Sequence, residues 1–310
     1  MRKTAALAGL LCLMAAAAQA APAVLHSDHP LAGTLWDVRE GRRVSEQAFF
    51  AEAATARWVL LGEKHDNAEH HRLQARVIGA LARSGRRPGV VWEMAEPAQG
   101  AALREARLAE VDVLGAALDW EARGWPAWPE YQPIAEQALS HGLAMYPGKP
   151  SRDLVRRVSR GEPPPPEIAD RFDFNRPYPA EIEATLLEEL ASSHCGRLPE
   201  EALGPMVRVQ RLWDAWMADT LLRAAEESDG AVLIAGAGHV RKDRAVPWQL
   251  RLAGQSAGRI LTLALVEVTA GYNDTTAYDA FDPRRFDFVW FTPRVDENDP
   301  CAAFDGGTVQ

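Results

Sequence analysis

Two short stretches, each an apolar run followed by glycine and histidine, most constrain how this chain can fold. The first is Trp58-Val-Leu-Leu-Gly-Glu-Lys-His65, and the second is Ala231-Val-Leu-Ile-Ala-Gly-Ala-Gly-His239. Each apolar run is short and continuous, which indicates a buried strand rather than an amphipathic helix. A good N-cap, Asp66 or Asn67, follows the first stretch, and a charged helix start follows the second. Both histidines are therefore predicted to lie where a parallel strand gives way to a helix.

In open α/β sheets ligands bind at this edge, because strand ends and helix N-termini converge there. A further predicted strand, at 90–94, carries Glu93 near its end. We therefore expect His65, Glu93 and His239 to share one crevice. The alternative, usual for a lone histidine, is that each imidazole only satisfies hydrogen bonds within its own turn. Two matching turns favour the shared crevice.

Strands alternate with helices along much of the chain, which predicts an α/β fold with a mostly parallel sheet flanked by helices and an inserted helical subdomain. Residues 21–310 are expected to form a single α/β domain. Its sheet core is predicted at about 33–97, 143–149 and 229–293, and its helical subdomain at about 98–142 and 150–228. The run 286–291 alternates poorly and is predicted to be an edge strand, and 242–252 is predicted to be a helix.

The first 20 residues indicate a cleaved signal peptide, since two basic residues precede an apolar run that ends in the small-x-small sequence Ala18-Gln19-Ala20. The run is too short for a membrane anchor. Leucines precede Cys12, where lipid attachment needs a small residue, so lipoprotein anchoring is not expected. The sequence therefore predicts an exported, periplasmic protein.

Charge and cysteine content narrow the function classes. The net charge is −9 at pH 7 without a basic stripe, which argues against a nucleic-acid partner. Cys195 and Cys301 remain after the signal peptide, and an oxidising compartment would allow them to pair, although sequence alone does not establish the pairing. The alternative for Cys195 is a soft metal or haem ligand.

Glu63, His65 and His239 offer one carboxylate and two imidazoles, the donor set of catalytic zinc and non-haem iron sites. One hypothesis is therefore a metal-dependent hydrolase, protease-like or esterase-like, in which a divalent metal ion activates water. The sequence has no phosphate loop, no complete dinucleotide fingerprint and no Gly-x-Ser-x-Gly elbow, so nucleotide enzymes and serine hydrolases are poorly supported.

Four motifs, in order, resemble the ChaN-type haem-binding uptake proteins of the Tiki/TraB-like superfamily. They lie at Gly62–His71, His194–Pro199, Gln210–Ala218 and Gly236–Asp243, and the resemblance covers roughly residues 35–270. It implies an α/β fold with a parallel sheet and a helical subdomain, in an exported protein of iron or haem acquisition. It also implies haem bound between two protomers, with an axial tyrosine and a nearby histidine.

The resemblance suggests which residues hold haem. Tyr131, in Trp128-Pro-Glu-Tyr131, best matches a family-like Trp-x-x-Tyr segment, and Tyr146 is the second candidate. The other expected haem-site residues are His65, His239, Met206, Gln210 and Arg241. Arg208, Arg211 and Arg241 are candidate partners for the propionates. Met206 belongs to a Met and Trp stripe at helical spacing, and such a stripe is more often core packing than a pocket wall.

One departure from the family pattern concerns an Asn-x-Pro-Arg segment after the third strand, where this chain has Tyr146-Pro-Gly-Lys-Pro-Ser-Arg152. The expected function is that of an exported haem-binding protein in haem or iron uptake, a homodimer served by an outer-membrane receptor or a haem-transfer partner. The alternative is the metal-dependent hydrolase that uses Glu63, His65 and His239. A third hypothesis is an interaction protein whose histidines are structural.

Overall fold

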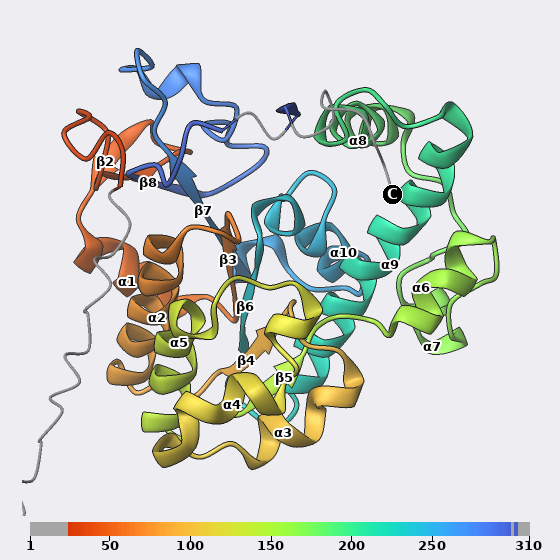
Figure 1. Ribbon diagram of the computed structural model, residues 1–310, viewed down its shortest axis with the longest axis horizontal. Helices are drawn as coiled ribbons and strands as arrows, with labels where there is room; N and C mark the ends of the chain where they lie inside the picture. Colours follow the sequence, from red (N-terminus) through yellow and green to blue (C-terminus); the bar gives the residue numbers. More distant parts are fainter. Residues whose placement is uncertain (1–23, 299–300, 303–310) are drawn as a thin grey trace, which may run out of the picture.

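The computed structural model describes residues 24–298 and 301–302, and the predicted signal peptide lies outside these residues. Within the described chain, helices cover both faces of an eight-stranded sheet (Figure 1). The strands are β1 (Leu35–Asp37), β2 (Arg42–Val44), β3 (Trp58–Glu63), β4 (Gly89–Trp92), β5 (Met145–Pro147), β6 (Ala231–Gly236), β7 (Ile260–Glu267) and β8 (Phe288–Thr292). The α-helices are α1 (Glu46–Thr55), α2 (Ala68–Arg83), α3 (Gly100–Glu105), α4 (Val111–Ala117), α5 (Trp128–Ser140), α6 (Arg152–Ser159), α7 (Pro166–Arg171), α8 (Ala180–Ser193), α9 (Glu200–Ala224) and α10 (Val246–Leu252).

The sheet is mostly parallel, as predicted. Its strand order is β2-β1-β8-β7-β3-β6-β4-β5. The six strands from β3 to β8 are all parallel to one another. The two antiparallel strand pairs both contain β1, which has β2 on one side and β8 on the other. The prediction of an edge strand at 286–291 is wrong, because β8 lies between β1 and β7. Its residues alternate poorly because all five are buried, which is typical of a strand covered on both faces.

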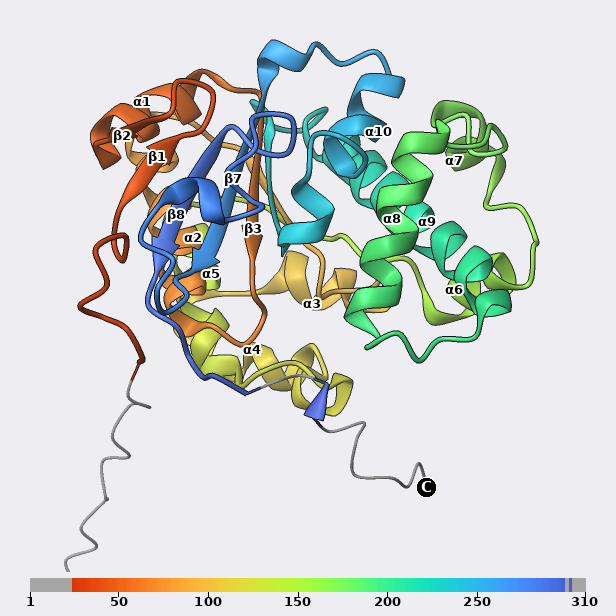
Figure 2. The same ribbon diagram turned by 90° about the horizontal axis from the view of Figure 1, so that it is seen from above.

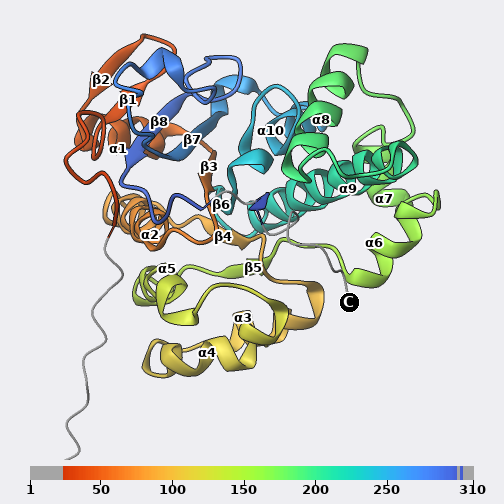
Figure 3. The same ribbon diagram turned by 45° about the horizontal axis from the view of Figure 1, so that its top comes forward.

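Alternate residues of β3 face two different cores. Val59 and Leu61 pack with residues of α1, α2 and α5, whereas Trp58 and Leu60 pack with residues of α9 and α10. Figure 3 shows α2 and α5 on one side of the central strands and α9 on the other. The helices α5 and α9, both within the predicted helical subdomain, thus pack next to the sheet, while α6, α7 and α8 gather around α9 (Figure 2).

Local capping fixes where the first helices begin. Ser45 caps α1 by accepting from the amide of Ala48, and Asn67 caps α2 by accepting from the amide of Glu69. The helix predicted at 242–252 begins only at Val246, because the chain first makes a 3₁₀ turn at Ala237–Val240. That turn packs closely on β3, since a Cβ added at Gly62 would lie 2.4 Å from Val240 Cγ2.

A disulfide joins Cys195, in the α8–α9 connection, to Cys301 near the end of the chain, with the two Cα atoms 5.6 Å apart. The pairing that the sequence left open is therefore present. No helix in the described ranges is long and apolar enough to cross a membrane.

Candidate functional site

The carboxyl ends of three central strands bring the predicted histidines and carboxylates together. Glu63 ends β3, Glu93 directly follows β4, and His239 lies in the 3₁₀ turn after β6. Together with His65 and with Asp214 of α9, they form what we call the strand-end cluster. The structure thus brings His65, Glu93 and His239 together, as expected from the paired glycine–histidine turns.

Each imidazole of the cluster is held from behind by a carboxylate. His65 Nδ1 lies 2.7 Å from Glu63 Oε1, and His239 Nδ1 lies 2.7 Å from Asp214 Oδ1. The two Nε2 atoms face the same buried carboxylate, at 3.8 Å from Glu93 Oε2 for His65 and 3.6 Å from Glu93 Oε1 for His239. The amide of Gly236 also donates to Glu93 Oε2, at 2.7 Å. Glu93 therefore links both imidazoles.

Burial and charge act against each other on these groups. Burial lowers the pKa of His65, but the hydrogen bond with Glu63 and the charges of Glu93 and Glu63 together raise it to about 9. Burial likewise opposes protonation of His239, yet Glu93 and Asp214 raise its pKa. Burial would raise the pKa of Glu93, but the two imidazoles and the Gly236 amide lower it. The arrangement favours a carboxylate held as an ion pair between two protonated imidazoles.

Tyr131, the first candidate for an axial ligand, is fully buried behind the cluster. Its hydroxyl donates to Glu63 Oε1 at 2.6 Å, and its ring stacks on His71 with the centroids 3.7 Å apart. Burial and the charge of Glu63 raise the pKa of the Tyr131 hydroxyl above its ordinary value. Tyr131 therefore acts as a hydrogen-bond donor that fixes Glu63 and, through it, His65.

Two indoles and a lysine lie at the half-buried edge of the strand-end cluster, beside His65, and we call this edge the mouth of the cluster. The Trp125 ring lies 5.1 Å from the His65 ring, and the Trp213 ring lies 5.8 Å from the His239 ring. Lys149 Nζ lies 5.1 Å from the Trp125 centroid and 4.5 Å from the Trp213 centroid. The sequence reasoning missed all three as site residues, although Lys149 falls in the segment that departs from the family's Asn-x-Pro-Arg pattern.

The structure does not bring two other predicted haem residues to the cluster. Tyr146, on β5, donates its hydroxyl to Glu227 just beyond α9. Arg241 is 7 % exposed and is paired with Asp243 and Glu189. Its guanidinium is therefore already neutralised by carboxylates.

Met206, Gln210 and the other two predicted arginines lie along α9. Met206 packs against the small apolar group around Tyr178, and Gln210 is half-buried. Arg208 donates to the carbonyl of Ser159, and Arg211 donates to the carbonyls of Asp173 and Arg176. These residues belong to the helical layer rather than to the strand-end cluster.

Arg208 and Arg211 line a cleft in this helical layer, which we call the helical-layer cleft. One cavity, of about 610 Å³, is lined among others by Phe174, Arg176, Tyr178, Val207, Arg208 and Arg211. A second cavity, of about 560 Å³, shares Arg176, Tyr178 and Arg211 and adds Trp248 and Leu252. The Arg211 guanidinium lies 4.7 Å from the Tyr178 centroid. Tyr178 was missed from the sequence, where its signal is the aromatic and cationic segment Phe172-Asp-Phe-Asn-Arg-Pro-Tyr178.

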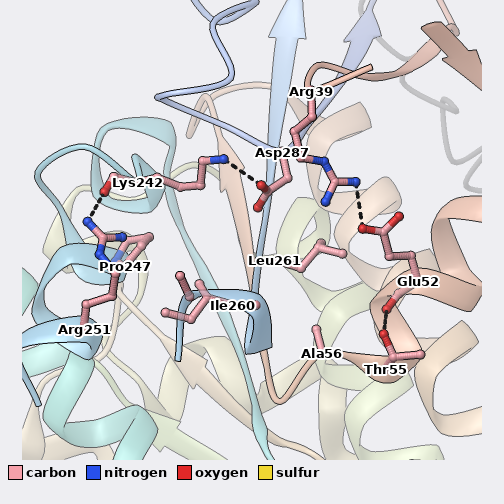
Figure 4. Close-up of a pocket in the computed structure, with 12 residues that line it drawn as sticks. Arg39, Glu52, Thr55, Ala56, Lys242, Pro247, Arg251, Ile260, Leu261 and Asp287 are labelled. Carbon is pink, nitrogen blue, oxygen red and sulfur yellow. Dashed lines mark hydrogen bonds and ion pairs between the residues drawn. The ribbon is translucent and has the colours of Figure 1, made fainter. Parts of the chain in front are cut away.

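A smaller cavity of about 260 Å³ opens at the opposite, amino-terminal edge of the sheet, where β7 begins with Ile260 and Leu261 (Figure 4). Four of its charged groups form two pairs, since Lys242 Nζ lies 2.7 Å from Asp287 Oδ1 and Arg39 donates to Glu52 at 2.7 Å. The fifth, Arg251, donates to the backbone carbonyl of Lys242.

The three predicted metal ligands, Glu63, His65 and His239, do not face one common position. Glu63 contacts His65 on its Nδ1 side, whereas His239 lies across Glu93 from the Nε2 side of the same ring. Within the part of the chain that the structure describes, no group of three or more His, Cys, Asp or Glu side chains is arranged to hold a metal ion.

Comparisons with known proteins agree with the fold and identify the family. Among solved structures, the chain is similar to that described as "Cofacial heme binding to ChaN of Campylobacter jejuni", with a TM-score of 0.64 and 21% identity over 83% of this chain and 95% of that one. A mutant of the erythromycin esterase EreC matches with a TM-score of 0.46 and 12% identity, over 87% of this chain and 98% of that one. A search of the curated proteins finds no match. The family model "Haem-binding uptake, Tiki superfamily, ChaN" matches residues 49–250, which is more than half of the chain. The chain therefore belongs to the ChaN family of haem-binding uptake proteins, within the Tiki superfamily.

Proposed function

We propose that this protein binds haem and takes part in haem uptake as an exported, periplasmic homodimer. The observation that carries the proposal is the helical-layer cleft, where a tyrosine, apolar side chains and three arginines meet inside the family-matched region. The disulfide is consistent with export, because such bonds persist in oxidising compartments.

The residues of the cleft fit haem, which needs apolar walls, an axial ligand and cations for its propionates. The Tyr178 hydroxyl has only long hydrogen bonds, at 3.4 Å to the carbonyl of Arg244 and 3.3 Å from Gln249 Nε2. Two buried polar atoms beside it, Arg211 Nε and Gln249 Oε1, have no hydrogen-bond partner. Such unsatisfied groups are costly in a protein interior, and a polar ligand group in the cleft would satisfy them.

The roles follow from this placement. Tyr178 would supply an oxygen ligand for the iron, Arg176, Arg208 and Arg211 would pair with the propionates, and Phe174 and Trp248 would form apolar walls. Burial and the Asp214 charge raise the pKa of Tyr178, while Arg211 and Gln249 oppose them. The haem would supply an iron that a phenolate holds in the ferric state, which suits transport rather than oxygen chemistry.

The cleft also suggests how two copies would meet. Leu252, which lines the cleft, is 39 % exposed and would offer apolar surface to a second copy. The solved ChaN structure is described as binding haem cofacially. We propose the same arrangement here, in which two protomers stack their haems and an outer-membrane receptor or a transfer partner exchanges them.

A haemin titration followed in the Soret region tests the proposal. The mature protein is expected to give a saturable, shifted Soret band that is lost in Tyr178→Phe and kept in Tyr146→Phe, the matched control. Size-exclusion chromatography with and without haemin reports the dimer. A spectrum that is the sum of free haemin and protein would refute haem binding, and a band lost in Tyr131→Phe but kept in Tyr178→Phe would refute the assignment to the cleft.

The strand-end cluster supports a second candidate function, hydrolysis by acid–base chemistry. The observation in its favour is that both Nε2 atoms face Glu93 while a carboxylate orients each ring from behind. Glu93 would take a proton from water as the water oxygen bonds to an ester carbonyl carbon. His65 would give its Nε2 proton to the leaving oxygen and, because Nε2 lies 3.8 Å from Glu93, would recover one from Glu93 through a bridging water.

Hydrolysis of 4-nitrophenyl acetate by the haem-free protein tests this second function. The rate is expected to exceed that of the buffer, to persist in EDTA and to fall at least about tenfold in Glu93→Gln, because general acid–base groups contribute factors of this size or more. His141→Asn, at the end of α5, is the control. Sensitivity to EDTA would instead favour the metal-dependent hydrolase, and equal rates in Glu93→Gln and the unmodified protein would refute the role of Glu93.

A further inference from the structure

We infer that Lys149, Trp125 and Trp213 form a binding subsite for an organic carboxylate at the mouth of the strand-end cluster, separate from the helical-layer cleft. This inference shares one element with the second candidate function and rests on it in that respect alone: both place a ligand at the strand-end cluster. It concerns binding, and it holds whether or not the bound molecule is hydrolysed.

Lys149 lacks the ion pair that the other lysines in the described chain have. Lys64 pairs with Asp66 at 3.0 Å and with Glu267 at 3.3 Å, and Lys242 pairs with Asp287 at 2.7 Å. No hydrogen bond or ion pair joins the Lys149 ammonium to a described side chain, and its nearest aromatic neighbours are the faces of Trp213 and Trp125. An ammonium carries three donors, so this group is left with its hydrogen-bonding capacity free for a ligand.

The position of Lys149 is built into the fold rather than left to a flexible loop. It follows β5, and its amide donates to the carbonyl of Ala95 at 2.9 Å, while the amide of Gly148 donates to the carbonyl of Trp92 at 2.7 Å. A Cβ at Gly148 would lie 2.8 Å from that Trp92 oxygen. The backbone therefore runs against the end of β4, and this close approach sets the lysine beside Glu93.

The surroundings stabilise a cation but leave it incompletely paired. Burial lowers the pKa of Lys149, against the opposing charges of Glu93 and Glu96. Glu96 is itself bound to Arg123, and Glu93 faces the two imidazoles, so neither carboxylate is free to pair with the ammonium. Indole faces attract an ammonium, but they do not accept its hydrogen bonds as an anion does.

The charge at the mouth selects the class of anion. A single negative charge matches the ammonium, with the imidazole of His65 beside it. A doubly charged phosphate would bring more negative charge close to Glu93 than these cations offset. The Trp125 and Trp213 rings flank the ammonium and offer apolar surface to a planar group. An aromatic carboxylate therefore combines both features that the mouth presents.

Titration of the haem-free protein with benzoate, followed by ¹H–¹⁵N spectra of the tryptophan indoles, tests the inference. Trp125→Phe and Trp213→Phe assign the two signals. Benzoate is expected to shift both signals saturably, and Lys149→Met is expected to weaken the apparent affinity at least tenfold. Lys64→Met is the matched control, since its ammonium is already paired, and it is expected to bind benzoate as the unmodified protein does.

Three outcomes would overturn the inference. These are the absence of a saturable shift, equal affinities in Lys149→Met and the unmodified protein, and binding of inorganic phosphate but not of benzoate. Haemin separates the two sites: haem-loaded protein is expected to bind benzoate unchanged, and Lys149→Met is expected to keep the Soret band. If haemin displaces benzoate, the mouth is part of the haem site and the separate subsite is refuted. If haemin does not bind at all while benzoate does, the haem proposal fails and the carboxylate subsite stands.

Discussion

Replacing Glu63 with glutamine is expected to change how the stability of this protein depends on pH. The Glu63 carboxylate holds His65 Nδ1 at 2.7 Å, and it is a main reason why the pKa of this imidazole rises to about 9. Glutamine keeps the size and an acceptor oxygen but removes the negative charge. The pKa of His65 in Glu63→Gln should therefore fall toward its ordinary value, with part of the elevation left by Glu93.

The direction in which stability changes with pH follows from proton linkage. A histidine whose pKa is higher in the folded than in the unfolded chain binds its proton more tightly when folded, so it stabilises the fold below about pH 6.5 and loses this contribution as the pH rises through about 9. The full elevation corresponds to about 3.4 kcal/mol. Because the His65 side chain is 35 % exposed, solvent screening reduces this to about 1–2 kcal/mol. Because Glu93 keeps part of the elevation in Glu63→Gln, the unmodified protein should lose at most that much more unfolding free energy than Glu63→Gln between pH 6 and pH 10.

Urea unfolding at pH 6 and pH 10, together with an NMR titration of His65, measures both quantities. The hydrogen bond from Tyr131 to Glu63 is weakened by the substitution at both pH values, so its effect largely cancels in the difference. Glu69→Gln is the control, because Glu69 pairs with Arg72 on the exposed side of α2. A His65 pKa near 6.5 in the unmodified protein, or the same pH dependence in Glu63→Gln, would refute the reasoning.

Three further substitutions test the packing and the cross-link by denaturant unfolding. Gly62→Ala places a Cβ 2.4 Å from Val240 Cγ2 and should cost about 1–3 kcal/mol, whereas Gly204→Ala, whose Cβ would meet only Arg208 at 3.9 Å, should cost nothing. Cys195→Ser removes the disulfide between two residues that are 106 positions apart. The chain-entropy model limits the resulting loss of unfolding free energy to about 4.8 kcal/mol. An unfolding midpoint of the unmodified protein that does not change with reductant would contradict this prediction. Asp287→Ala removes the partner of Lys242 and of Thr262 and should cost about 3–5 kcal/mol, and a loss below about 1 kcal/mol would show that the pair is dispensable.

Local patterns in the sequence were enough to place the strand-end cluster. The runs before Gly62 and Gly236 specify buried strands, and Asn67 caps the next helix, so the positions of His65 and His239 follow from short-range rules. The role of Asp214 did not follow, because a residue on α9 meets His239 only once the helix packs across the sheet. The sequence contains Asp214 in a family-like motif but does not say which imidazole it holds.

Tyrosine assignment shows the same limit. The Trp-x-x-Tyr match pointed to Tyr131, yet nothing in the sequence says that this hydroxyl is directed inward at Glu63. Tyr178 and Arg211 lie far apart along the chain, and the cleft that they line depends on how α9 meets the segment before α8. The central position of β8 was missed for a related reason, since whether a strand is at an edge depends on which other strands flank it.

The pairing of β1 imposes an order on assembly. Leu35–Asp37 pairs with β2 and with Phe288–Thr292, and with no other strand of the described sheet. While the chain is being made, its first hairpin therefore has no place to dock until almost all of the polypeptide has emerged. Until then the outer side of β7 is an open edge with unpaired amides and carbonyls, which other chains could join. A nascent chain that stops before residue 288 would thus expose the edge of β7 and the unpaired side of β1. A chaperone that binds these edges before β8 is made would prevent their pairing with other chains.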